Sequence, residues 1–128
     1  MASLTEIVRS KKAKMEGVMR SSVLRLGNRI IQDSPVDTGR FINNWMSAVG
    51  TQDTSTRNDE SMSGSQSSAD LENMTSELKP KQIGYFTNSL PYAEVLELGS
   101  SAKAPSGMVA VNVLDWQEIV DSETRAAR

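Results

Sequence analysis

The sequence has 128 residues, a formal net charge of −2, 38% hydrophobic residues and only 5% aromatic residues. A chain of this length forms one domain that buries roughly two-thirds of the surface its unfolded form exposes, so it folds without covalent staples. It contains no cysteine and no histidine, which excludes disulfide frameworks, thiol chemistry, Cys/His zinc sites and imidazole catalysis. No apolar run approaches the ~20 residues of a membrane span, and residues 1–9 lack a signal-peptide pattern. We therefore expect a soluble intracellular protein that acts by binding.

Charge is distributed unevenly along the chain. Residues 1–32 hold seven basic residues against two acidic ones, and the rest of the chain holds seven against fourteen. Such asymmetry is typical either of a nucleic-acid surface or of head-to-tail contact between subunits. The simpler interpretation is the solvated face of an amphipathic helix, and we favour it over nucleic-acid binding because no aromatic residues are interleaved for base stacking.

The first predicted element is one long helix. Apolar residues recur at spacings of three, four and seven along one stripe: Leu4, Ile7, Val8, Met15, Val18, Met19, Leu26 and Ile30. Ser3 and Glu6 match a capping box, and the step from Ser34 to Pro35 ends the helix. About 30 residues span roughly 45 Å, so part of this helix projects or packs against another subunit.

The middle of the chain alternates between strands and polar segments. We predict a strand over 41–50, a flexible polar loop over 51–68, a short helix over 70–78 and a second strand over 83–87. Pro91 then opens a short helix that runs through Leu98 and ends at Gly99.

The C-terminal third is predicted to contain one strand and one helix. Residues 109–113 (VAVNV) have the clearest strand pattern in the chain, and a helix begins near Asp115 and frays from Ser122 onward. The fold class is therefore α+β, with a long N-terminal helix and short helices packed on a small, mostly antiparallel twisted sheet. We expect a single domain over 1–128, with Trp45 and Trp116 both buried and with Met15, Met19, Met46, Met74 and Met108 filling core gaps.

Three segments combine turn chemistry with nearby apolar residues. The first is 34–40 (SPVDTGR) with Trp45 downstream, in which Pro35, Asp37, Thr38 and Gly39 form a structural turn. The second is 88–100 (NSLPYAEVLELGS), and the third is 104–109 (APSGMV), which leads into the predicted third strand.

In this order, the three segments resemble the minor tail, tail-completion or head–tail joining proteins of tailed phages. The matching positions are residues 35–39 with Trp45, Asn88, residues 91–93, Glu97 with Gly99, and residues 104–109. The resemblance implies a virion structural protein without cofactor or enzymatic activity, which forms a ring in the neck at the head-proximal end of the tail. The polar segment 51–79 departs from the pattern, so we expect a family strand there to be missing or displaced.

The resemblance also implies the partners. They are other copies of the chain, in a hexamer by preference, a tail-terminator or tail-tube ring, and head-completion or portal-side neck proteins. Genomic DNA passes through such a ring without specific contact, no membrane is involved, and the protein resides in the host cytoplasm before it joins the virion. In this hypothesis wedge-shaped subunits close through heterologous contacts, opposite charges fix the register between neighbours, and the loop over 51–68 orders on docking.

Seven residues are candidates for contact with a neighbouring subunit or partner: Arg9, Lys12, Arg20, Arg25, Tyr92, Glu94 and Glu97. Tyr92 equally fits an inward ring with an exposed hydroxyl, and the i, i+3 pair Glu94 and Glu97 fits a solvated helix face better than a metal or catalytic dyad. Two other classes of function stay open. A small nucleic-acid-binding regulator would use the basic helix and bind less at high salt, whereas a small enzyme lacks an evident nucleophile–base pair or a phosphate-binding glycine loop.

Overall fold

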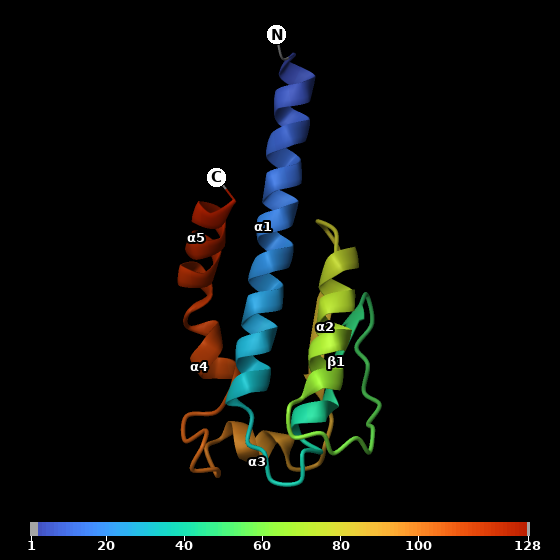
Figure 1. The fold of residues 1–128 in the computed structure, drawn as a ribbon, viewed down its shortest axis with the longest axis vertical. Helices are drawn as coiled ribbons and strands as arrows, with labels where there is room; N and C mark the ends of the chain where they lie inside the picture. The colour runs from blue at the N-terminus through green and yellow to red at the C-terminus, as the bar shows by residue number, and fades with distance from the viewer. Residues whose placement is uncertain (1–2, 128) are drawn as a thin grey trace.

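One helix, α1 (Leu4–Asp33), runs along most of the length of the molecule, and the other elements gather around its C-terminal half (Figure 1). The computed structural model describes residues 3–127. After α1 come η1 (Ile42–Asn44), β1 (Trp45–Val49), α2 (Ser65–Glu77), β2 (Gly84–Asn88), α3 (Ala93–Glu97), α4 (Val109–Val113) and α5 (Trp116–Ala126). Helices α4 and α5 lie on one side of α1 and α2 lies on the other, while α3 crosses near the C-terminal end of α1 (Figure 1). The α+β class is confirmed.

The predicted bounds of α1 are confirmed, together with the residues that set them. The Ser3 hydroxyl accepts a hydrogen bond from the Glu6 N–H, and the Glu6 carboxylate accepts one from the Ser3 N–H, both at 3.2 Å. The helix ends where Ser34, just before Pro35, takes an extended conformation, and the Ser34 hydroxyl donates to the carbonyl of Ile30 at 2.8 Å.

The sheet has two antiparallel strands among residues 3–127. Both predicted strands form, the first shortened to β1, with Trp45 opposite Asn88 and Val49 opposite Gly84. Trp45 holds the sheet to the core, because its ring stacks on Phe86 with centroids 4.8 Å apart and its indole N–H donates to the Ser34 hydroxyl at 2.9 Å.

Helix α2 begins earlier than the sequence predicts, at Ser65 rather than Asp70. The predicted loop therefore shortens to residues 51–64, which contain neither helix nor strand. Two small residues explain the early start: Gly64 is buried against Ile42, and Ser67 is buried and accepts a hydrogen bond from the Trp45 N–H. Two small residues, Gly64 and Ser67, thus occupy interior positions at the start of α2.

The strand predicted over 109–113 is wrong, because these residues form helix α4. The carboxylate of Glu97 accepts hydrogen bonds from the N–H groups of Met108, Val109 and Ala110, each at 2.9 Å, and so satisfies the first turn of a helix. Asn112 is buried on the inner face, while Val111 and Val113 are exposed. The alternation of valine with other residues over these five positions therefore does not indicate a strand with one buried face.

The core lies between the C-terminal half of α1, α2 and the sheet. Its buried members are Ile30, Ile31, Phe41, Ile42, Trp45, Leu71, Met74, Leu78, Leu90, Ala104 and Met108. Trp45, Met46, Met74 and Met108 are buried as predicted. The predictions for two other residues are wrong: Met15 is 70% exposed on the projecting half of α1, and Trp116 is 37% exposed at the start of α5.

Candidate interaction surface

The N-terminal half of α1 is a helix without tertiary cover. Every residue from Ser3 to Met15 is exposed, and Figure 1 shows this part extending beyond the ends of α2 and α5. Leu4 and Met15 are 78% and 70% exposed, and Ile7 and Val8 are also exposed. Because the spacing of Leu4, Val8 and Met15 follows the helical repeat, these side chains lie on one stripe. A solvated helix face does not usually carry an apolar stripe, so this stripe indicates a contact surface.

Basic side chains lie on and around this stripe: Lys11 falls within it between Val8 and Met15, Lys12 and Lys14 flank it, and Arg9 lies farther round the helix. They are Arg9, Lys11, Lys12 and Lys14, and within residues 3–127 none of them forms an ion pair. The structure thus places the predicted residues Arg9 and Lys12 together on the projecting part of the helix. The same segment contains one acidic residue, Glu6, which is engaged in the N-cap.

The stripe continues into a groove between α1 and α5. The groove has a volume of about 620 Å³, and Met15, Val18 and Met19 line it from α1 while Trp116 and Val120 line it from α5. Ser22 also lines it; its hydroxyl is buried and has no hydrogen-bond partner among the described residues. The apolar stripe and the groove form one continuous surface on the α5 side of α1.

Arg20 and Arg25, which we predict at an interface, are used inside the chain instead. Arg20 donates from Nε to the carbonyl of Leu78 at 2.8 Å, and Arg25 donates to the Ser122 hydroxyl at 2.9 Å. Arg25 also lies 3.7 Å from the carboxylate of Glu123. Their first role is to hold α1 against the C-terminus of α2 and against α5.

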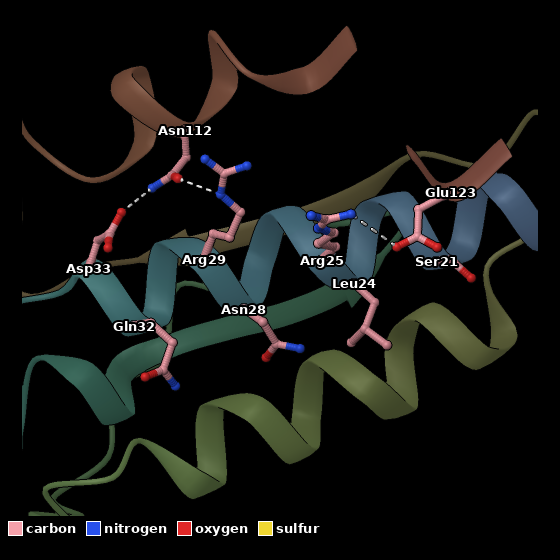
Figure 2. Close-up of a pocket in the computed structure, with 9 residues that line it drawn as sticks. All are labelled: Ser21, Leu24, Arg25, Asn28, Arg29, Gln32, Asp33, Asn112 and Glu123. Carbon is pink, nitrogen blue, oxygen red and sulfur yellow. Dashed lines mark hydrogen bonds and ion pairs between the residues drawn. The ribbon is translucent and has the colours of Figure 1, made fainter. Parts of the chain in front are cut away.

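A second polar cluster joins α1 to α4 and α5. Figure 2 shows Asn112 between Asp33 and Arg29: its amide donates to Asp33 at 2.8 Å, and its carbonyl oxygen accepts from Arg29 Nε at 3.1 Å. Arg29 also pairs with Asp115 at 2.5 Å. These residues border an open depression of about 590 Å³ along α1. Because its charged groups are already paired, we assign the cluster a structural role that the sequence spacing does not reveal.

The three other predicted interface residues lie in or beside α3, and their surroundings differ. Glu94 is exposed, and Tyr92 is 40% exposed with its ring tilted against Phe41 at a centroid distance of 6.0 Å. Glu97 is half-buried and caps α4, so it is unavailable to a partner. Partial burial acts to raise the pKa of Glu97, but the backbone hydrogen bonds from Val109, Ala110 and Met108 outweigh burial and hold that pKa below its usual value.

The predicted turn after α1 is present. Gly39 has φ +88°, and a Cβ at this position would collide with the carbonyl of Glu60. The Thr38 hydroxyl accepts a hydrogen bond from the Arg40 N–H at 3.2 Å. Pro35 and Asp37 line a shallow depression with Tyr92, and within the described chain Asp37 makes no hydrogen bond. Thr38 rather than Asp37 provides the side-chain bond of this turn, and its purely architectural role stays a prediction.

Two consecutive asparagines fasten the polar segment 51–64 to this turn. The Asn43 amide donates to the carbonyl oxygens of Gly39 and Ser61, and Asn44 exchanges hydrogen bonds with the backbone of Arg57 at 2.8 and 2.9 Å. In the sequence, the neighbouring pair Asn43-Asn44 is the only local sign of these contacts between residues 51–64 and the turn. The flexibility of the segment stays a prediction.

No group of three or more acidic side chains within residues 3–127 is arranged to hold a metal ion. In the same part of the chain, no helix combines the length and apolar character needed to cross a membrane. Comparisons with protein-family models, with curated proteins and with solved structures find no significant match to this chain. The phage-neck resemblance therefore depends on the three sequence segments alone.

Proposed function

We propose that this protein is a structural component of a tailed-phage neck, which assembles with copies of itself into a ring at the head-proximal end of the tail. The observation that carries the proposal is the uncovered apolar stripe on the projecting half of α1. Exposing Leu4, Val8 and Met15 to water costs the molecule free energy that a partner surface recovers. The ordered resemblance of residues 34–45, 88–100 and 104–109 supplies the kind of assembly.

The partners of this proposal are those that the resemblance implies. A hexamer is the favoured ring, flanked by a tail-terminator or tail-tube ring on one side and by head-completion or portal-side proteins on the other. In this proposal the protein acts through shape rather than catalysis, needs no cofactor, and resides in the virion after assembly in the host cytoplasm.

Native mass spectrometry and negative-stain electron microscopy of the purified chain, over a wide range of protein concentration, test the proposal. Discrete closed rings, together with detection of the protein in purified phage particles, are the expected result. A strictly monomeric protein that is also missing from the particles refutes the proposal.

One observation favours a second candidate, a nucleic-acid-binding regulator. Arg9, Lys11, Lys12 and Lys14 are exposed and, within the described chain, free of ion pairs. Fluorescence anisotropy with labelled duplex DNA distinguishes the two candidates. A regulator binds with an affinity that falls steeply with salt concentration, whereas a neck protein that only surrounds DNA gives no specific complex.

A further inference from the structure

A second groove lies on the other side of the molecule, between β1 and α2. Its volume is about 350 Å³, and Ala48, Val49 and Met74 form its apolar part. Ser47 also lines it, with a hydroxyl that is buried and has no partner within residues 3–127. The groove therefore has a partly apolar lining and an unused hydrogen-bonding group.

Acidic residues border this groove. Asp70 and Glu77 of α2 lie along it, and Asp70 is paired with Arg57 at 2.6 Å. Glu77 has no ion-pair partner in the described chain. Residues 49–77 hold six acidic residues and one basic residue, and two lysines follow in 79–81.

The projecting half of α1 has the opposite character. Residues 4–15 hold four basic residues and one acidic residue beside an apolar stripe. Two such segments packed against each other would place like charges together, which disfavours a symmetric α1–α1 contact. Within residues 3–127, the β1–α2 side offers an exposed groove that combines carboxylates with apolar side chains.

The positions of the two surfaces determine the kind of assembly. The apolar stripe lies in line with the groove against α5, whereas α2 lies on the opposite side of α1 (Figure 1). Two different patches on opposite sides of a subunit make a heterologous, head-to-tail contact, and such contacts close into rings when the rotation permits.

We infer that the projecting half of α1 in one copy of the chain docks in the β1–α2 groove of the next copy. Its apolar stripe lies over Val49 and Met74, and Lys11, which lies on that stripe, is beside Glu77. The inference rests on the proposed function, since it names the partner surface within the proposed ring.

Reciprocal charge reversal tests the contact. The first variant carries Lys11→Glu, and the second carries Glu77→Lys. Each variant alone places like charges across every contact, so the concentration needed for half-assembly rises about tenfold or more in sedimentation velocity. An equal mixture restores assembly, because a ring of alternating variants has opposite charges at every contact.

The matched control is Glu118→Lys, which makes the same charge change on the exposed face of α5. This variant assembles like the native chain and does not rescue the first variant. Far-UV circular dichroism and thermal unfolding verify that each variant is folded.

Cysteine cross-linking provides a readout independent of charge, since the chain has no native cysteine. Val8→Cys and Asn73→Cys, each on an exposed residue, form mixed dimers with a short bismaleimide, while Val8→Cys alone does not. If the native chain assembles but the charge reversals have no effect, or Val8→Cys links mainly to itself, this contact is wrong and the ring proposal stands. A native chain that does not self-associate in solution or in particles refutes both.

Discussion

The Glu97 carboxylate is the strongest single test of how the C-terminal third is held together. Its two oxygens accept three backbone N–H bonds at the start of α4, a helix of five residues. Such a short helix has little stability of its own, because few intrahelical bonds offset the cost of nucleation. Glu97 therefore supplies much of the reason why residues 109–113 are helical.

The cost of Glu97→Ala follows from the surroundings of the three donors. The Met108 N–H belongs to a buried residue, and leaving a buried donor unsatisfied costs about 1–3 kcal/mol. Val109 and Ala110 are more exposed, so water replaces part of their bonds and the loss is about 0.5 kcal/mol each. We expect Glu97→Ala to reduce the free energy of unfolding by about 2–4 kcal/mol, and Glu97→Gln, which keeps one acceptor, by about 1–2 kcal/mol.

The contribution of Glu97 also depends on pH. Its pKa in the folded protein lies below the usual 4.5, so the stabilisation is complete above that value and is lost as the pH falls through the folded pKa. The stability difference between the native chain and Glu97→Gln is therefore largest near neutral pH and shrinks below about pH 4.5.

Urea unfolding followed by far-UV circular dichroism, at neutral pH and at several acidic pH values, measures these differences. The midpoint shifts while the slope stays constant, because the surface exposed on unfolding is unchanged. Equal midpoints for the native chain and both variants at neutral pH would show that Glu97 does not cap α4, and the explanation of why 109–113 is not a strand would fail with it.

Three further predictions concern α1 and the core. Gly27→Ala destabilises the protein by about 1–2 kcal/mol because its new Cβ meets a buried leucine of α2. Gly17→Ala has nothing within 4 Å of its new Cβ and stabilises the protein by up to about 1 kcal/mol. Paired thermal unfolding curves measure both changes, and equal effects of the two substitutions would contradict the described packing of α1 on α2. Trp45→Phe costs about 1–3 kcal/mol, because it removes the indole bond to Ser34 and leaves a gap in the core, and a urea midpoint within error of the native one refutes this. Deletion of residues 1–12 changes the unfolding free energy by less than about 0.5 kcal/mol, since the described part of this segment is exposed, but abolishes ring formation; rings that persist in electron micrographs count against the role of α1.

The sequence predicts well the features that are determined locally. The ends of α1 depend on Ser3, Glu6 and Pro35, which act within a few residues of themselves. The prediction for 109–113 failed because the deciding group, Glu97, belongs to α3 and lies eleven to thirteen residues before the N–H groups that it caps.

The candidate interaction surface also has some features that are determined locally and others that depend on residues far apart in the sequence. Arg9 and Lys12 are exposed as predicted, because neighbours along a helix determine the exposure of a projecting segment. Arg20 and Arg25 looked alike in the sequence, but their partners lie 58 and 97 residues away and become neighbours only through folding. The β1–α2 groove combines residues from two elements and has no signature in either one.

The unsupported half of α1 has a consequence for dynamics. Between Ser3 and Met15 the helix is maintained by its cap and its own backbone bonds, and a segment of that length is marginally stable in water. Its amide protons should exchange with deuterium progressively faster towards Ser3. The amide protons near the buried residues Ile30 and Ile31, at the other end of α1, should exchange slowly. In the proposed ring a neighbouring copy would cover this segment and slow its exchange, so assembly and the last step of folding would be one event.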